Sequence, residues 1–236
     1  MPAQHIVRAF DDDLKFLRTR IAQMGGHAER MVEQAVAALV GADAGLAARV
    51  IADDKVLDEG QREIDDRAIV VIAKRQPMAD DLREVIGAIR ISSDLERVGD
   101  LGKNIAKRAA TVLGSGGRPL SVSRGFQSLS DLALTQMKDV LDVYATRAVE
   151  RIGFVRDRDE DIDAMYTSLF RELLTYMMED PRNITPCTHL LFCAKNIERI
   201  GDHATNIAET VYHIVTGEVM PAERPNRDKS HGITVT

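Results

Sequence analysis

One polar motif occurs twice in the sequence and carries the side chains best suited to chemistry. Residues 95–106 read Leu-Glu-Arg-Val-Gly-Asp-Leu-Gly-Lys-Asn-Ile-Ala, and residues 197–208 read Ile-Glu-Arg-Ile-Gly-Asp-His-Ala-Thr-Asn-Ile-Ala. Matching positions are 102 residues apart throughout, as from Glu96 to Glu198 and from Asp100 to Asp202. Two copies at matched positions indicate a tandem duplication.

On a helix, the acids and the amide of each copy lie one turn apart, on the side opposite to the apolar positions. These outward-facing residues are Glu96, Asp100 and Asn104 in the first copy and Glu198, Asp202 and Asn206 in the second. Carboxylates stacked in this way repel each other unless a cation neutralises them. For a single acid pair a solvated helix face is the commoner explanation. The repetition of the whole set favours a cation site in each copy.

Two further acid pairs precede the motif copies on neighbouring predicted helices. Asp54 and Asp58 are spaced i, i+4, and so are Asp159 and Asp163. If these helices pack antiparallel to the motif helices, each pair faces one motif copy. A ligand set made only of oxygens favours hard cations such as Mg²⁺, Mn²⁺ or iron over a thiolate zinc site. A solvated face remains the alternative for these pairs taken alone.

The elements that must hold these residues are predicted to be helices, because apolar residues recur at spacings of three and four and no period-two alternation persists. We therefore expect an all-α fold of six long helices in two tandem, similar three-helix bundles. Asp43 is the expected N-cap of the second helix. Gly25-Gly26 is a candidate kink in the first. The expected helices cover approximately residues 14–39, 43–75, 79–113, 121 or 123–144, 147–178 and 186–216.

The expected domain organisation follows from the breaks between these helices. The first bundle is predicted over residues 1–113 and the second over 121–217. The Gly- and Pro-containing segment 114–120 is predicted to be a linker. The polar segment 218–236 is predicted to be a disordered tail.

Composition excludes several classes of protein. Aromatic residues are only 4% of the 236 residues and the formal charge is −6, which argues against a nucleic-acid-binding surface. The start of the sequence lacks the apolar run of a signal peptide, and two cysteines cannot form a disulfide framework, so we expect a cytoplasmic protein. Cys187 and Cys193 have no trusted metal-ligand spacing and are expected in the core. No Glu-x-x-His pair, phosphate loop or nucleophile elbow occurs, which argues against an enzyme.

Both motif copies, Leu-Glu-Arg-Val-Gly-Asp and Ile-Glu-Arg-Ile-Gly-Asp, each followed by x-x-x-Asn-Ile, closely resemble the two signature motifs of the PhoU family. Residues 73–77, 81–83, 175–180 and 191–194 resemble further segments of that family, and the resemblance covers residues 5–217. It implies two similar three-helix bundles with metal clusters on their surfaces. It implies as metal ligands Glu96, Asp100, Asp54 and Asp58 in one half and Glu198, Asp202, Asp159 and Asp163 in the other, with Asn104 and Asn206 as weaker candidates. Fe, Mn, Mg and Zn all remain open.

The resemblance also implies a function. The implied function is that of a non-enzymatic, negative regulator of the phosphate-starvation response when phosphate is plentiful, which also regulates phosphate uptake. The implied partners are PstB, the ATPase of the phosphate ABC transporter, and the membrane sensor kinase PhoR. Contact with the membrane is expected only through these partners, and a homodimer is expected. The alternatives from other classes are a metal-storage or metal-dependent hydrolytic protein and a helical scaffold without metal.

Overall fold

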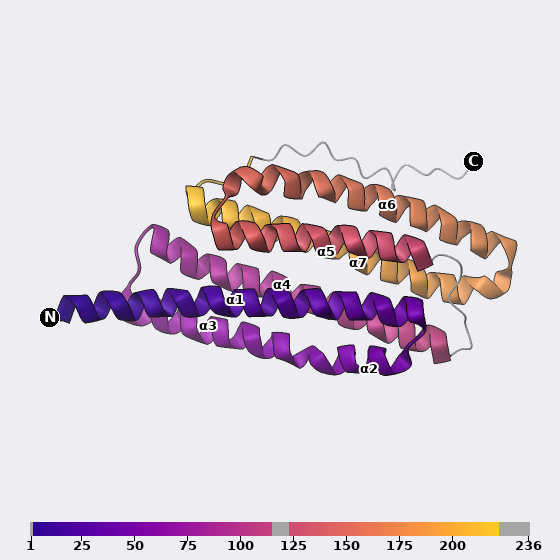
Figure 1. The fold of residues 1–236 in the computed structure, drawn as a ribbon, viewed down its shortest axis with the longest axis horizontal. Coiled ribbons are helices and arrows are strands. Elements are labelled where there is room, and N and C mark those ends of the chain that lie inside the picture. Colours follow the sequence, from indigo (N-terminus) through magenta and orange to yellow (C-terminus); the bar gives the residue numbers. More distant parts are fainter. Residues whose placement is uncertain (1, 115–122, 222–236) are drawn as a thin grey trace.

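The computed structural model describes residues 2–114 and 123–221, with side chains from Phe10 onward. Long helices with short connections make up the described chain, as the apolar spacing predicts (Figure 1). In chain order the helices are α1 (Pro2–Gly41), α2 (Ala44–Asp53), α3 (Lys55–Arg75), α4 (Asp80–Gly114), α5 (Ser123–Thr146), α6 (Ile152–Glu179) and α7 (Ile184–Thr216), with short 3₁₀ turns η1 (Val149–Arg151) and η2 (Pro181–Asn183). The all-α prediction of two three-helix units is confirmed.

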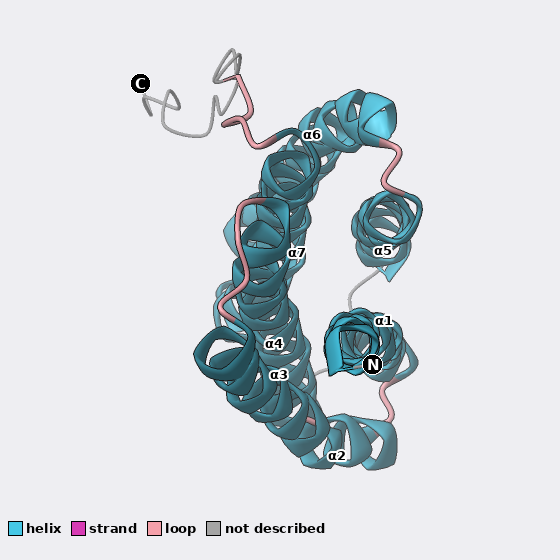
Figure 2. Cartoon of the chain, turned by 90° about the vertical axis from the view of Figure 1, so that its left-hand side faces the viewer, coloured by secondary structure: helices cyan, strands magenta, loops and turns pink. Residues whose placement is uncertain are grey.

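Helices α4 and α7, which carry the two motif copies, form the centre of the molecule. They pack against each other, α3 packs on the outer side of α4, and α6 packs on the outer side of α7. Viewed end-on, these helices and α2 form one curved layer, and α1 and α5 lie on its concave side (Figure 2). The duplicated halves therefore join through their motif helices.

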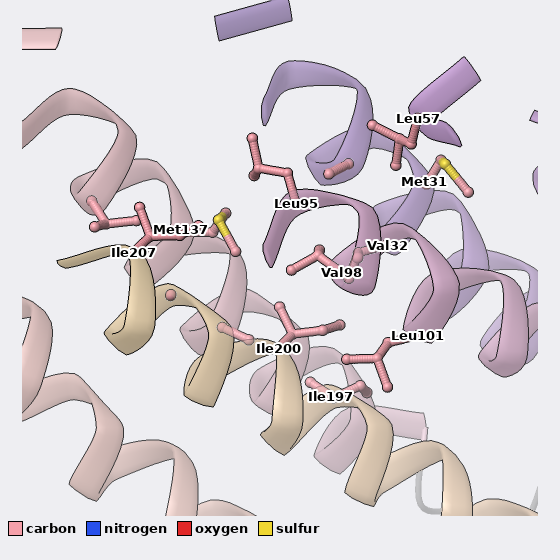
Figure 3. Close-up of a cluster of buried hydrophobic side chains, with 14 of the residues drawn as sticks. Met31, Val32, Leu57, Leu95, Val98, Leu101, Met137, Ile197, Ile200 and Ile207 are labelled. Atoms are coloured by element: carbon pink, nitrogen blue, oxygen red, sulfur yellow. The ribbon is translucent and has the colours of Figure 1, made fainter. Parts of the chain in front are cut away.

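The apolar side of each motif copy lies in a core shared by both halves. Leu95 and Val98 of the first copy and Ile197, Ile200 and Ile207 of the second are fully or almost fully buried (Figure 3). Burying a side chain of this size stabilises the fold by about 1.5–3 kcal/mol. The apolar positions of the repeat thus fix which sides of α4 and α7 face solvent or the neighbouring helices.

The Gly25-Gly26 pair does not divide the first helix, because α1 runs through it without interruption. A Cβ atom at Gly25 would lie 2.5 Å from Leu141 Cδ1 of α5. The absence of a side chain at Gly25 therefore lets α5 approach α1 closely, which the spacing of residues in the sequence did not indicate.

The predicted single helix over 43–75 is wrong, because Asp54 separates α2 from α3. Asp43 does cap the start, and its side chain accepts a hydrogen bond of 2.8 Å from the Leu46 amide. At the break, the Leu57 amide bonds to the Asp54 carbonyl three residues back, at 3.0 Å, which tightens the turn. Asp54 is also bound by Lys103 of α4. Neither glycine nor proline marks the break, so the sequence carried no signal for it.

The predicted linker 114–120 lies outside the described residues except for Gly114, as does the predicted tail 218–236 beyond Pro221. The proposed domain boundaries therefore stay predictions. Both cysteines are free and buried, as expected. None of the helices in residues 2–114 and 123–221 is long and apolar enough to cross a membrane.

Candidate functional site

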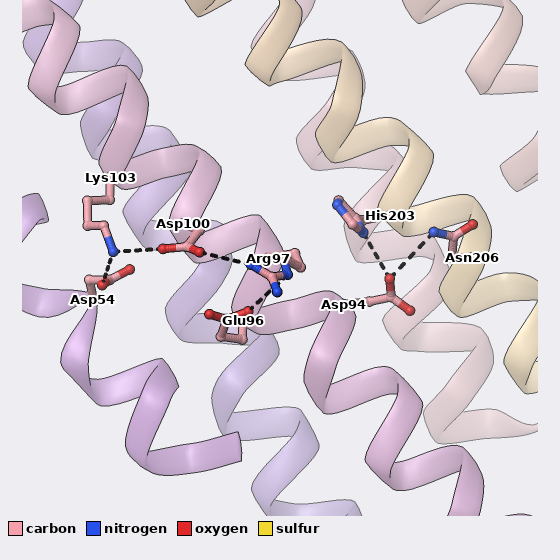
Figure 4. Close-up of polar contacts among 8 residues, drawn as sticks. All are labelled: Asp54, Asp94, Glu96, Arg97, Asp100, Lys103, His203 and Asn206. Carbon is pink, nitrogen blue, oxygen red and sulfur yellow. Dashed lines mark hydrogen bonds and ion pairs between the residues drawn. The ribbon is translucent and has the colours of Figure 1, made fainter. Parts of the chain in front are cut away.

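The first acid cluster, defined as Asp54, Asp58, Glu96 and Asp100, lies where the α2–α3 junction meets α4. Lys103 Nζ donates a hydrogen bond of 2.7 Å to Asp100 Oδ1 and a second one to Asp54 Oδ2 (Figure 4). Asp54 is only 8% exposed, so this ammonium group supplies the charge that its buried carboxylate needs. The antiparallel packing predicted from the sequence therefore brings the acid pair to the motif.

Arg97 adds a second positive charge at the surface of the first acid cluster. Its guanidinium lies 3.5 Å from Glu96 Oε2 and 3.4 Å from Asp100 Oδ2. Its side chain is mostly exposed, so these ion pairs are weak and easily exchanged for water or another cation.

The second acid cluster, defined as Asp159, Asp163, Glu198 and Asp202, lies where α6 meets α7. Lys195 Nζ donates to Glu198 Oε1 at 2.6 Å, whereas the buried Glu198 Oε2 has no hydrogen-bond partner within the described chain. Thr205 Oγ1 donates to Asp159 Oδ1 at 3.3 Å. The second cluster is therefore bordered by a neutral hydroxyl at the place where Lys103 enters the first.

Each motif glycine allows the acid-bearing helix to approach. A Cβ atom at Gly99 would overlap Leu57 Cδ1 of α3. A Cβ atom at Gly201 would lie 3.0 Å from Ile162 Cδ1 of α6. Leu57 and Ile162 directly precede Asp58 and Asp163 in the sequence. The glycines thus position the acid pairs against the motif carboxylates in both halves.

Burial and neighbouring acids perturb the carboxylates. Burial, followed by the negative charge of Asp100, raises the pKa of Glu96 above its usual value. Burial also raises the pKa of Glu198, and the charges of Asp202 and Asp163 act in the same direction. Burial alone would lower the pKa of Lys103, but its hydrogen bonds to Asp100 and Asp54 outweigh burial and raise it. The four acids of the first cluster therefore share one electrostatic environment, and so do Glu198, Asp163 and Asp202 of the second.

The two weaker candidates for metal ligands, Asn104 and Asn206, lie in different surroundings. Asn104 is exposed on α4. Asn206 Nδ2 lies 3.5 Å from Asp94 Oδ1 of α4, and His203 Nδ1 lies 2.9 Å from the same oxygen (Figure 4). Asn206 and His203 thus contact the opposite half of the molecule.

The prediction that Glu198 faces outward is wrong, because this residue is only 9% exposed. A helical wheel gives the direction of a side chain but not the closeness of the next helix, and Gly201 lets α6 cover this part of α7. Sequence reasoning also missed Lys103, Thr205 and Gln136. Lys103 and Thr205 could have been found, because they occupy matching positions at which the two motif copies differ.

The residues fit a hard cation in donor chemistry, since carboxylate oxygens line both clusters and the Thr205 hydroxyl lies beside the second. The unpartnered Glu198 Oε2 is an oxygen that a cation could satisfy. Among the described residues, however, no group of three or more His, Cys, Asp or Glu side chains is already close enough to hold a metal ion. The metal ligands inferred from the sequence therefore stay a prediction.

The fold and its paired clusters define a class of protein: all-α chains of two similar three-helix bundles, each with a Glu-x-x-x-Asp motif packed against an acid pair on the neighbouring helix. Comparison with known protein families gives one match in each half of the chain. The model of the PhoU domain matches residues 21–109 and again residues 126–211. The chain belongs to the PhoU family.

Relatives and solved structures agree with this assignment. The chain is 64% identical to the "Phosphate-specific transport system accessory protein PhoU homolog" of Rhizobium meliloti (strain 1021), over 97% of this chain and 96% of the relative. It is 47% identical to the protein of the same name from Caulobacter vibrioides (strain NA1000 / CB15N), over 95% of this chain and 97% of the relative. The crystal structure of PhoU from Pseudomonas aeruginosa superposes with a TM-score of 0.84 at 36% identity, covering 89% of this chain and all of that one.

Proposed function

We propose that this protein is an accessory regulator of a bacterial phosphate uptake system. The observation that carries the proposal is its 64% identity to a phosphate-specific transport system accessory protein, over nearly the full length of both chains. The doubled motif supports the assignment, because the domain of the family is matched once in each half of the chain.

The finer proposal is that the protein acts as an adaptor. It contacts the transporter ATPase PstB and the sensor kinase PhoR, and it holds the kinase in its repressing state when phosphate is plentiful. An adaptor of this kind needs only to bind one conformation of its partner better than the other. A coupling free energy of about 1–3 kcal/mol changes the partner's equilibrium roughly 5- to 150-fold. A homodimer is part of this proposal.

The two acid clusters are the proposed cation sites of the adaptor. A bound cation would relieve the repulsion between carboxylates and link α6 to α7, or α3 to α4, through shared oxygen ligands. The residues that would hold it in the second half are Glu198 and Asp202 of α7 and Asp159 and Asp163 of α6, and in the first half Glu96, Asp100, Asp54 and Asp58. Elemental analysis of the purified protein tests this, with an Asp100→Ala, Asp202→Ala variant as the comparison; equal metal content would contradict the assignment.

Deletion of the gene tests the regulatory role. Expression from a phosphate-starvation promoter should rise in phosphate-rich medium and return to its repressed level when the wild-type gene is restored. Unchanged expression in the deletion strain would contradict the proposal. A purified protein that instead turned over a phosphoester, or loaded many metal ions per chain, would favour the hydrolytic or storage alternative.

A further inference from the structure

A pocket of about 400 Å³ opens at the surface between the start of α4 and the end of α7. This α4–α7 pocket is lined by residues of the segment 79–90 and by Thr210 and His213 of α7. Its wall is mostly apolar, and Leu82 and Ile86 are partly exposed in it. A cavity of about 150 Å³ with an apolar lining already accommodates a benzene ring. The α4–α7 pocket is therefore large enough for an aromatic side chain.

The internal repeat shows what fills the matching place in the other half of the chain. Three residues that line the pocket have counterparts at the 102-residue offset of the repeat: Arg90 with Phe192, Thr210 with Arg108, and Gly87 with His189. The Arg108 guanidinium lies 4.1 Å from the centroid of the Phe192 ring, and Arg108 Nη1 lies 3.5 Å from His189 Nδ1. The pocket is thus the place in which the other half holds a phenyl ring beneath an arginine.

The ionisable side chains that line the pocket are all basic: Arg83, Arg90 and His213. Arg83 forms an ion pair with Asp80, whose side chain is 85% exposed, so water weakens this pair. Arg90 is exposed and forms no hydrogen bond or ion pair with any described residue. The pocket therefore favours an aromatic ring that is accompanied by negative charge, because a guanidinium group is attracted to the face of the ring and to acids beside it.

The chain itself exposes an aromatic side chain of this kind. Phe154, in the first turn of α6, is 67% exposed. Asp157 and Asp161, three and seven residues later, are exposed on the same face of the helix. Arg158, on the other flank, lies 2.9 Å from Asp139 of α5 and is paired there. Phe154 thus lies at an acidic edge of the molecule, which is complementary in charge to the α4–α7 pocket.

Phe154 and the α4–α7 pocket lie at the same end of the molecule but do not meet within one chain. The starts of α4 and α6 and the end of α7 all lie at the left-hand end in Figure 1. Phe154 is not among the residues that line the pocket, and most of its side chain faces solvent. Two chains related by a two-fold axis can each insert Phe154 into the pocket of the other, because an isologous interface repeats every contact.

We infer that the α4–α7 pocket is a dimerisation site, which receives Phe154 of a second copy of this chain. The ring packs against Leu82 and Ile86, and Arg90 lies over its face. It takes the place that Phe192 occupies in the other half, and the acids beside it face the basic side chains of the pocket. The inference rests on the homodimer in the proposed function and gives that homodimer its contact residues.

Sedimentation velocity of the purified full-length chain, over a concentration series, tests the inference. The wild-type chain should show a monomer–dimer equilibrium. Phe154→Ala should raise the dimer dissociation constant about thirtyfold or more, because a buried aromatic anchor is lost from both contacts. Arg90→Phe combined with Thr210→Arg fills the pocket with the residues of the matching place, and this filled-pocket variant should lose the dimer to a similar extent. Met178→Ala is the control, since it truncates an 80% exposed side chain far along α6 and should leave the equilibrium unchanged.

Mixing the two impaired variants is the decisive measurement. The filled-pocket variant keeps Phe154, and the Phe154→Ala variant keeps its pocket, so the mixture can form one of the two contacts. It should contain a heterodimer at concentrations at which neither variant dimerises alone. Only an interface that exchanges two different surfaces predicts this complementation.

Circular dichroism shows whether each variant is folded, and the exposed change Arg90→Glu replaces the filled-pocket variant if the latter is not. A wild-type chain that is monomeric at every concentration would leave the pocket to another partner and overturn the inference. An undiminished dimer in either impaired variant, or no heterodimer in the mixture, would also overturn it. The starvation-promoter assay separates the two proposals, because a monomeric chain that still represses the promoter would overturn the dimer contact and leave the regulatory role standing.

Discussion

Substitution of the motif glycine on α4 is the sharpest test of how the first acid cluster is assembled. In Gly99→Ala the new methyl group would overlap Leu57, which is 1% exposed and cannot move into solvent. Overpacking of this kind costs about 1–3 kcal/mol. The same change in a helix interior gains about 0.5–1 kcal/mol from the loss of glycine flexibility. The variant should therefore be less stable than the wild type by up to about 2 kcal/mol.

Gly26→Ala on α1 is the matched control, because the nearest atom to its new methyl group is Arg30 Nη1 at 3.5 Å, the end of an exposed side chain. This variant should gain about 0.5–1 kcal/mol. Urea denaturation of both proteins gives the difference in the free energy of unfolding, expected at about 1–3 kcal/mol in favour of the control. Equal stabilities would refute the close approach of α3 to α4.

A double-mutant cycle locates the clash. Leu57→Ala alone leaves a cavity and should cost about 2–5 kcal/mol. Combined with Gly99→Ala, it removes the overlapping atoms, so the pair should be more stable than the sum of the single changes by about 1 kcal/mol or more. Strict additivity would show that the methyl group meets something other than Leu57.

Three further predictions concern other parts of the molecule. Glu84 is a buried acid of α4 that binds Arg18 Nε at 3.1 Å and the Arg147 guanidinium, so it joins the two halves. Glu84→Ala should therefore lower the free energy of unfolding, measured by urea denaturation, by about 2–3 kcal/mol. A loss below the scatter of the measurement would contradict this. Burial raises the pKa of Cys193 to about 12, so a thiol reagent should label it only after unfolding; labelling of the native chain would contradict its burial. In chelator, Glu198→Gln should gain stability relative to the wild type as pH rises above the usual Glu pKa of 4.5. The reason is that a carboxyl whose pKa is raised by folding stabilises the protein below its unfolded pKa and loses this contribution as pH rises through the folded pKa. A stability difference that does not change with pH would contradict this.

The sequence predicted the helices and the two matched clusters because both depend on local periodicity and on the repeat. Asp43 caps α2 as its residue type predicts, and Leu95 and Ile197 are buried as their positions in the repeat predict. These features are decided within a few turns of one helix.

The features that were missed depend on which helices lie side by side. Asp54 interrupts a helix without glycine or proline, at a place where Lys103 of α4 binds it. Gln136 is 0% exposed and reaches Thr205 from α5, a helix outside the two motif copies. Glu198 is buried because α6 approaches Gly201. Periodicity gives the direction of each side chain but not the separation of the helices.

Capture of the proposed partners is the most direct test of the account's central claim, that this PhoU-family chain is an adaptor of the phosphate uptake system. The affinity-tagged protein would be purified from cells grown at high and at low phosphate, and the transporter ATPase and the sensor kinase quantified in each eluate. The account predicts that both are captured, with more kinase at high phosphate. Recovery of neither partner at either phosphate level, with the tagged protein folded and able to repress the starvation promoter, would contradict the adaptor role.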